Sequence, residues 1–267
     1  MILTAENYYS QEANRVFMSV SQFKDFVGTY GRVGCETAAL AKLRGDFEEE
    51  KTTALLVGSY VDAYFEGQES LERFKEENPQ IFTKSGTLMA AYRRADDIIA
   101  RCEQDPFFAM CMSGEKQVIM TGTVFGVPWK IKMDSYHPGK VIVDLKIVES
   151  ITKPKWVRDV GYLDFIRYWG YDLQGAIYQE VVYQNTGERL PFYIAAATKE
   201  PVTDIAVINV QDNYLKEAMG LVEYNLPHVM DVKNGKVAPT SCGLCDHCRK
   251  TKVLTGPIGL LDLIKDV

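Results

Sequence analysis

The sequence MDSYHPGKVIVDLK, residues 133–146, predicts two short strands joined by a tight turn. The turn signal is HPG at 137–139, because proline fixes φ and glycine accepts positive φ. Asp134 ends the first expected strand. Residues two apart on a strand point to the same side. Asp144 and Lys146 should therefore emerge together near Asp134, while the residue between them points into the opposite layer.

Two carboxylates from adjacent strands can chelate Mg²⁺, which prefers hard oxygen ligands. Lys146 could orient an attacking water or neutralise charge that develops on phosphorus. These parts together suit phosphodiester hydrolysis. The alternative from spacing alone is that Asp134 flanks a turn, and that Asp144 and Lys146 form an ion pair on an exposed strand.

Composition is that of an ordinary globular chain of 267 residues, 46% of them hydrophobic. We expect a cytoplasmic protein, because the start does not resemble a signal peptide and no apolar run reaches about 18 residues. In that compartment the six cysteines are expected to be metal ligands or core residues. The net charge is −6, yet residues 130–158 hold seven basic and three acidic side chains. This local excess fits a site for a polyanion, or else a solvated charged face.

The order of predicted elements favours a mixed central β-sheet flanked by helices, in one domain spanning 1–267. Helices are expected before residue 115, and strands at 117–124, 129–134 and 141–146 as an antiparallel meander. The segment after residue 155 is predicted to be helical, with breaks near Gly161 and Gly170, and its second half is the helix 171–184. Strands follow at 192–198 and 205–210, and a helix begins at about 212. Residues 1–17 carry no clear pattern, and we expect them to form an arm or a strand that contributes to a partner.

Three motifs in chain order resemble those of the PD-(D/E)xK nuclease superfamily: Asp134, Asp144-Leu145-Lys146 and Gln174-x3-Tyr178. The resemblance is to the RecB-like branch, which includes RecE-type phage exonucleases and CRISPR-associated RecB-type nucleases. It extends back to Gly58-x3-Asp62 and forward to the terminal cysteines, so it covers most of the chain. It implies a restriction-endonuclease-like core.

The resemblance also implies roles for these residues. Asp62, Asp134, Asp144 and the Leu145 carbonyl would ligate Mg²⁺ (or Mn²⁺). Lys146 would be the catalytic lysine beside Asp134 and Asp144. Gln174 and Tyr178, four residues apart on one helix face, would contact DNA. The family usually has histidine where this chain has Asp62, and aspartate can ligate Mg²⁺ through oxygen. Glu115 is a further candidate, for which a surface position is the preferred interpretation.

Cys242, Cys245 and Cys248 form a C-x2-C-x2-C motif, whose thiolates can turn towards one metal. By the resemblance, Cys35 would be the fourth ligand of a [4Fe-4S] cluster that joins the two ends of the domain. The spacing in those families is usually C-x2-C-x5-C, so Zn²⁺ held by the same thiolates is the alternative. A zinc site formed by three thiolates and His247 is a less favoured alternative. The remaining two cysteines are predicted to be buried small hydrophobic residues: Cys102 and Cys111.

The first functional hypothesis is a metal-dependent DNA exonuclease of phage or prophage type that hydrolyses phosphodiester bonds at duplex DNA ends for recombination. The resemblance implies a single-strand annealing recombinase as partner and often a homo-oligomeric ring, and no membrane association is expected. The alternative is a non-catalytic DNA-binding or scaffold protein that retains the nuclease fold. A third hypothesis is a zinc-stabilised interaction module in which the hairpin charges are incidental.

Overall fold

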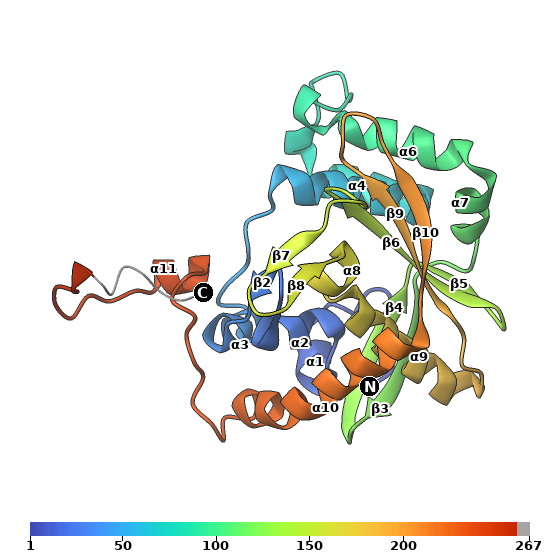
Figure 1. The fold of residues 1–267 in the computed structure, drawn as a ribbon. Coiled ribbons are helices and arrows are strands. Elements are labelled where there is room, and N and C mark those ends of the chain that lie inside the picture. The colour runs from blue at the N-terminus through green and yellow to red at the C-terminus, as the bar shows by residue number, and fades with distance from the viewer. Residues whose placement is uncertain (261–267) are drawn as a thin grey trace.

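A computed structural model describes residues 1–260 and has a four-stranded mixed sheet at its centre (Figure 1). The strands lie in the order β10 (Ile205–Val210), β9 (Phe192–Thr198), β6 (Val141–Val148) and β5 (Ser135–His137). β6 and β9 run parallel, and the two outer pairs are antiparallel. The predicted mixed sheet flanked by helices is therefore confirmed.

Each face of the sheet packs against its own helices. Leu145 of β6 faces a core formed with α4 (Thr53–Glu66), α6 (Arg94–Gln104) and α7 (Pro106–Cys111). Ile142 faces the opposite core, formed with α2 (Val20–Val27), α9 (Tyr171–Thr186) and α10 (Asp212–Lys233). This alternation is the two-residue period of a strand buried on both sides. It points Leu145 away from the layer that receives Asp144, as the sequence predicts.

The remaining helices are short: α1 (Gln11–Val16), α3 (Glu36–Arg44), α5 (Gln68–Glu77), α8 (Phe165–Tyr168), α11 (Asp246–Lys250) and the 3-10 turns Pro79–Ile81 and Ala90–Tyr92. A small ribbon pairs β1 (Gly28–Thr29) with β2 (Arg32–Val33). Across residues 1–260, every helix is too short or too polar to span a bilayer.

The expected three-stranded meander is wrong, because the chain changes sheets at Asp134. β3 (Val118–Val124) and β4 (Val127–Met133) form one hairpin, whereas β5 pairs with β6 in the central sheet. The Asp134 carboxylate accepts a hydrogen bond from the Leu145 backbone N–H at 2.9 Å. The Asp134 side chain thus accepts a hydrogen bond that a backbone carbonyl would accept in a regular sheet. The Leu145 N–H stays satisfied where β4 ends and the chain changes sheets.

The helix expected after residue 155 is also wrong, because this segment is a β-hairpin of β7 (Lys155–Val157) and β8 (Gly161–Leu163). Trp156 and Tyr162 are residue types that favour strands. Asp159 and Gly161 have φ of 64° and 96°, a backbone conformation that turns the chain and is incompatible with a right-handed helix. The following helix α9 agrees with its predicted range to within two residues.

The N-terminal segment packs on its own chain, so the expectation of an arm or a strand given to a partner is wrong. Tyr8 and Ala13 are buried. Met18 donates its N–H to Pro128 O at 2.8 Å and accepts the N–H of Lys130 at 2.9 Å. These bonds attach the segment to the edge of β4.

Two glycines in helices provide a matched test of packing. A Cβ on Gly175 of α9 would lie 2.5 Å from Phe192 Cδ1 and 2.9 Å from Leu215 Cδ2, whereas a Cβ on Gly220 of α10 would meet nothing within 4 Å. Gly175→Ala should therefore lower the free energy of unfolding by about 1–3 kcal/mol through overpacking. Gly220→Ala should raise it by up to about 1 kcal/mol, because alanine favours helix. Urea unfolding measures both, and equal stability of the two variants would contradict this packing.

Candidate active site

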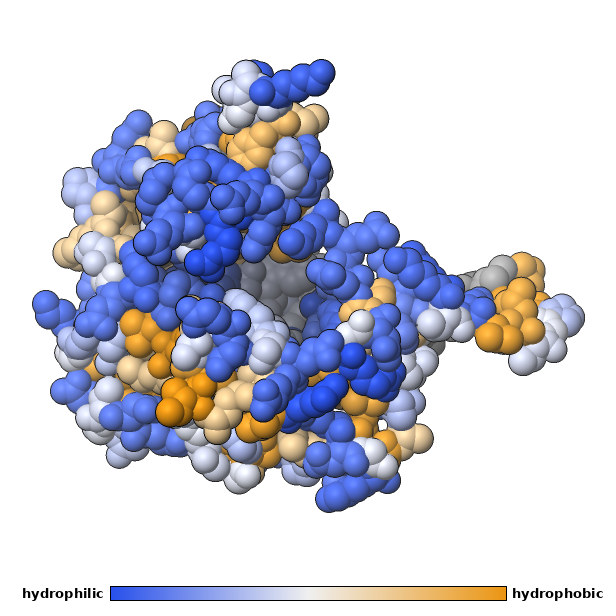
Figure 2. Space-filling view, turned by 180° about the vertical axis from the view of Figure 1, so that it is seen from behind, coloured by the Kyte–Doolittle hydropathy of each residue, from blue (hydrophilic) through white to orange (hydrophobic). Residues whose placement is uncertain are grey.

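A cavity of about 350 Å³ lies between α2, α4, β4, β6 and α9. It is lined by every acidic and basic side chain that the sequence predicts for the carboxylate site, and by both predicted DNA contacts: Asp62, Asp134, Asp144, Lys146, Gln174 and Tyr178. The face shown in Figure 2 is hollowed at its centre and rimmed largely by hydrophilic residues. The fold therefore brings predicted residues of α4, β6 and α9, together with Asp134 between β4 and β5, to one cavity.

Asp144 is held from two directions on β6 and is only 2% exposed. Its Oδ1 accepts a hydrogen bond from Gln174 Nε2 at 2.5 Å. Its Oδ2 forms an ion pair with the Lys146 ammonium and is a buried oxygen without a hydrogen-bond partner. A buried carboxylate oxygen served only by one cation has the capacity to accept a second positive charge.

Asp134 lies half-buried beside this pair. Burial, followed by the negative charge of Asp144, raises its pKa to about 7. The Lys146 ammonium and the Leu145 N–H act in the opposite direction without cancelling these effects. Near neutral pH this carboxyl group therefore exchanges a proton readily, unlike an ordinary aspartate.

Lys146 remains protonated. Burial alone would lower its pKa, but the charges of Asp144 and Asp134 outweigh it and raise the pKa above the ordinary lysine value. Its ammonium also lies 5.1 Å from the centre of the Tyr171 ring. A half-buried ammonium that stays charged suits stabilisation of a negatively charged transition state better than proton abstraction.

Asp62, near the end of α4, lines the same cavity. Desolvation by the surrounding protein and the charge of Asp134 raise its pKa well above the usual range. Within residues 1–260, three or more ligand atoms from histidine, cysteine or carboxylates lie within 4.8 Å of one another only at the four cysteines. The three aspartates thus share a cavity without closing to that distance, and their joint ligation of a metal stays a prediction.

The donor set nevertheless fits a hard divalent cation. Asp134 and Asp144 offer carboxylate oxygens on adjoining strands, and Asp144 Oδ2 is buried with only Lys146 beside it. Desolvation first, and neighbouring negative charge second, raise the pKa values of Asp62 and Asp134, and a bound cation would favour the ionised forms of both. These residues and the Leu145 carbonyl are the ones that would hold Mg²⁺.

Gln174 and Tyr178 project from the same face of α9, as predicted. Gln174 holds Asp144, and the Tyr178 hydroxyl donates to the Lys132 carbonyl of β4 at 3.0 Å. Their polar atoms therefore position the two strands that carry the aspartates, and contact with DNA stays a prediction. Glu115 exchanges two backbone hydrogen bonds with Tyr136 and is exposed outside the cavity lining, in agreement with the preferred surface interpretation.

Sequence reasoning missed a cluster of aromatic and basic residues at one wall. The Lys130 ammonium lies 4.5 Å from the Tyr8 ring centre, and the Lys132 ammonium lies 4.7 Å from that of Tyr9. All four residues line the cavity. The adjacent tyrosines, and the two lysines spaced two residues apart on β4, are sequence features that could have indicated this cluster. Nothing in the sequence showed that an N-terminal segment would reach them.

Three more residues of the cavity lining were missed: Lys24, Glu66 and Gln117. Glu66 follows Asp62 by one helical turn, a spacing that could have identified it. Burial and the Lys146 charge lower the pKa of Lys24 to about 7. Gln117 has a positive φ of 53°, and its Oε1 is buried without a partner. Such a backbone conformation in a non-glycine residue at a cavity is visible only in the structure.

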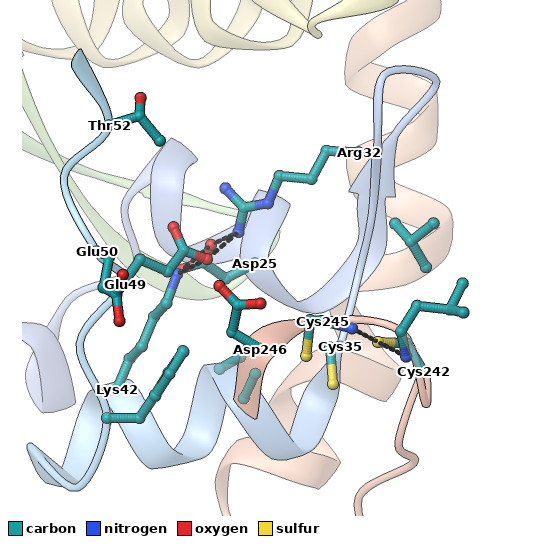
Figure 3. Close-up of a pocket in the computed structure, with 15 residues that line it drawn as sticks. Asp25, Arg32, Cys35, Lys42, Glu49, Glu50, Thr52, Cys242, Cys245 and Asp246 are labelled. Atoms are coloured by element: carbon teal, nitrogen blue, oxygen red, sulfur yellow. Dashed lines mark hydrogen bonds and ion pairs between the residues drawn. The ribbon is translucent and has the colours of Figure 1, made fainter. Parts of the chain in front are cut away.

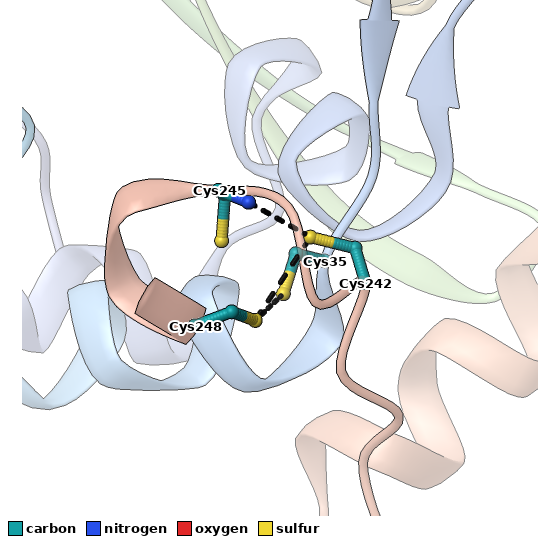
Figure 4. A group of neighbouring side chains, drawn as sticks. All are labelled: Cys35, Cys242, Cys245 and Cys248. Atoms are coloured by element: carbon teal, nitrogen blue, oxygen red, sulfur yellow. Dashed lines mark hydrogen bonds between the residues drawn. The ribbon is translucent and has the colours of Figure 1, made fainter. Parts of the chain in front are cut away.

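The predicted cysteine site also assembles (Figure 4). The sulfurs of Cys35, Cys242, Cys245 and Cys248 all lie within 4.8 Å of one another, and Cys35 Sγ is 3.5 Å from Cys248 Sγ. Burial disfavours the Cys35 thiolate, but N–H donors including that of Cys242 lower its pKa to about 6. Four convergent thiols with one already acidic are suited to soft metal ligation. Cys102 and Cys111 are buried away from this group, as predicted.

A cavity of about 410 Å³ separates the cysteines from a charged network on α2 and α3 (Figure 3). Asp25 forms ion pairs with Arg32 and Lys42, and Lys42 lies 2.9 Å from Glu49. Every charge of this network is compensated by a neighbour. The network therefore braces the helices around the cysteines.

Comparison with known proteins agrees with this geometry. A family model described as a PDDEXK-like domain of unknown function matches residues 19–251. The chain belongs to this PDDEXK-like family. A crystal structure described as that of a "putative exonuclease" from Eubacterium rectale is 60% identical, covers 100% of both chains and superposes with a TM-score of 0.96. No curated protein matches the chain significantly.

Membership of the PDDEXK-like family confirms the resemblance seen in the sequence. The family match includes the carboxylate hairpin, helix α9 and all four clustered cysteines, since it runs from residue 19 to residue 251. It begins after Tyr8 and Tyr9, which line the cavity in this chain.

Asp134→Asn should stabilise the metal-free protein at pH 8 by about 1–2 kcal/mol, since each pKa unit is worth about 1.4 kcal/mol and Lys146 offsets part of the effect. The folded state binds this proton more tightly than the unfolded chain does, so ionisation from about pH 4 to 7 costs stability. The gain should shrink as pH falls through 7. Urea unfolding at several pH values checks this, with Asp46→Asn, an exposed carboxylate paired with Arg44, as the control. A pH-independent gain would contradict the assignment.

Proposed function

We propose that this chain is a metal-dependent DNA exonuclease of phage or prophage recombination type that hydrolyses phosphodiester bonds at duplex DNA ends. The supporting observation is the Asp144–Lys146 ion pair, which lies beside Asp134 in a cavity that also holds Lys24 and Lys132. Carboxylates for a hard cation and ammonium groups for a phosphate backbone are both required for this reaction.

Each residue has a distinct part in the proposed reaction. When bound, Mg²⁺ (or Mn²⁺) supplies charge stabilisation at the phosphate and lowers the pKa of water. Lys146 stabilises negative charge on the scissile phosphate through its half-buried ammonium. Asp144 keeps that ammonium in place, and Gln174 fixes Asp144. Asp134 and Asp62 act in their ionised forms, so cation binding must release the protons that their raised pKa values favour.

The alternative is a non-catalytic DNA-binding or scaffold protein with the nuclease fold. The observation in its favour is that the oxygens of Asp62, Asp134 and Asp144 do not all approach within 4.8 Å. Rotation of side chains at the cavity rim, where Asp62 is exposed, offers a way to close this distance. The catalytic proposal is preferred because a buried Asp-Lys pair is costly to maintain without a role.

Further parts of the proposal follow the family resemblance of the motifs. The chain acts as a single nuclease domain in the cytoplasm. Double-stranded DNA ends are its substrate, a single-strand annealing recombinase is its partner, and a homo-oligomeric ring is its assembly.

A nuclease assay on linear duplex DNA tests the catalytic proposal. With Mg²⁺ the protein should release nucleotides from linear duplex and leave closed circular duplex intact. Lys146→Ala should reduce the rate about 100-fold or more, as is typical when one group that stabilises transition-state charge is removed. Lys140→Ala, an exposed lysine at the turn before β6, is the matched control and should retain full activity.

The outcomes separate the hypotheses. Equal rates for Lys146→Ala and the unaltered protein would exclude the proposed catalytic role. DNA binding without cleavage by the unaltered protein would favour the scaffold. Absence of both DNA binding and cleavage in the unaltered protein would favour a metal-stabilised interaction module.

For the cysteines we propose a [4Fe-4S] cluster with a structural role, ligated by Cys35, Cys242, Cys245 and Cys248, with Zn²⁺ as the alternative. The support is the convergence of their four sulfurs, which lie at the N-termini of α3 and α11 and in the loop between α10 and α11. The candidate ligand His247 has its ring 5.1 Å from that of Phe47, centroid to centroid. This contact is consistent with four thiolates as the full ligand set.

Metal analysis distinguishes the two cofactors. Protein prepared without oxygen should contain about four iron atoms and absorb broadly in the visible range, whereas a colourless protein with one zinc would exclude the cluster. Cys248→Ser should lose the metal and unfold at lower temperature. Cys102→Ser replaces a cysteine that is buried elsewhere and should keep the metal, which controls for general destabilisation.

A further inference from the structure

The β7–β8 hairpin presents two large aromatic side chains to solvent. Trp156 and Tyr162 are 65% and 69% exposed. They are direct cross-strand partners, with ring centroids 5.1 Å apart and ring planes at 68°. In this edge-to-face arrangement the edge of one ring meets only one face of the other, so aromatic surface remains available for another planar group.

The two faces of the hairpin differ in kind. Leu163, on the face opposite the rings, is 5% exposed and anchors the hairpin to the protein. Side chains alternate along a strand, so this anchoring turns Trp156 and Tyr162 outward. A two-stranded ribbon is only marginally stable by itself. The two largest apolar side chains of the hairpin are exposed, so they do not serve its packing. Their exposure therefore favours a role as an interaction surface.

In sequence, the hairpin lies between two elements whose side chains line the candidate active site. In the chain it follows β6, which carries Asp144 and Lys146, and precedes α9, which carries Gln174. Lys155 is bound to Glu149, just after β6, at 2.7 Å. Beyond the hairpin, at the end of α8, the carbonyl of Trp169 accepts a hydrogen bond at 3.0 Å from Lys24, which lines the cavity. Figure 1 shows the hairpin, in yellow, standing apart from the four-stranded sheet.

The charge of the hairpin favours an anionic partner. Residues 153–163 contain Lys153, Lys155 and Arg158 and one acidic residue, Asp159, a net charge of +2. The ion pairs of this segment with Glu149, Asp159 and Glu200 are at the surface, where such pairs contribute little. Phosphates of a nucleic acid can replace these partners at small cost.

We propose that Trp156 and Tyr162 form a stacking surface for unpaired nucleobases of a DNA strand engaged in the cavity. This inference rests on the proposed function and deepens it. Bases inside a duplex present only their edges, whereas unpaired bases present the π-faces that aromatic side chains bind without regard to sequence. The adjacent lysines would contact the backbone of the same strand. The hairpin would thus hold the strand at the end of a duplex.

Binding measured without divalent metal separates this role from cleavage. The probes are a fluorescein-labelled blunt duplex and the same duplex with a single-stranded overhang, titrated in EDTA. Trp156→Ala and Tyr162→Ala should each weaken binding of the overhang duplex about tenfold, because each removes an aromatic ring on which an unpaired base stacks. Blunt duplex should be affected less. Trp156→Phe and Tyr162→Phe should restore most of the affinity.

Tyr224→Ala is the matched control, because Tyr224 is an 84% exposed aromatic residue on α10. Its variant should bind both probes like the unaltered protein. Unchanged overhang binding by Trp156→Ala and Tyr162→Ala would overturn the proposal. So would a change in molar mass by light scattering with unchanged DNA binding, because the rings would then join copies of this chain.

The nuclease assay on the same preparations keeps the two proposals distinct. Cleavage by the unaltered protein with undiminished binding by both alanine variants would refute only the stacking surface. Overhang binding that depends on the rings, without any cleavage in Mg²⁺, would refute only the nuclease. Failure of the unaltered protein to bind the overhang probe would overturn the stacking proposal directly.

Discussion

The hydrogen bond from the Leu145 N–H to the Asp134 carboxylate connects the two β units of this protein. β4 belongs to one hairpin and β6 to the central sheet, and their meeting point is this contact between a side chain and the backbone. Because the bond fixes Asp134 opposite the stretch that carries Asp144 and Lys146, it determines which charges face the cavity. The candidate site therefore lies at the point where the chain passes from the β3–β4 hairpin into the central sheet, and the β5–β6 register continues to place Asp134 opposite Asp144.

The electrostatics of the cavity follow from this placement. Asp134 and Asp144 are drawn together by the backbone, and Lys146 alone among the residues on β6 opposes their charge. The result is a carboxyl group that holds its proton to about neutral pH beside an ammonium that does not release its own. An ordinary surface ion pair differs in that both groups are fully charged at neutral pH, and such a pair contributes little to stability. The difference indicates a site arranged for a further positive charge.

Sequence reasoning predicted the mixed sheet and the range of α9. Strand and helix periodicity placed Asp144 with Lys146, and Gln174 with Tyr178, on common faces, whereas the family resemblance predicted that these side chains share one site with Asp62 and Asp134. Sequence reasoning failed where long-range contacts decide the local structure. The residues after Lys155 contain helix signals, yet cross-strand pairing of two aromatic residues and a turn with positive φ make them a hairpin. Tyr8 reaches the cavity only because Met18 pairs with the edge of β4, a contact without a local signature.

The cysteine site joins residues 213 positions apart, Cys35 and Cys248, and so encloses the whole sheet and the candidate active site. A metal bound there closes a ring of covalent and coordinate bonds around nearly the entire fold. For a loop of this length the entropy that closure removes from the unfolded chain is worth about 5 kcal/mol, comparable with the total stability of many domains. The metal supply of the cell would then set how long this protein survives, although the four cysteines do not line the cavity that holds Asp144 and Lys146.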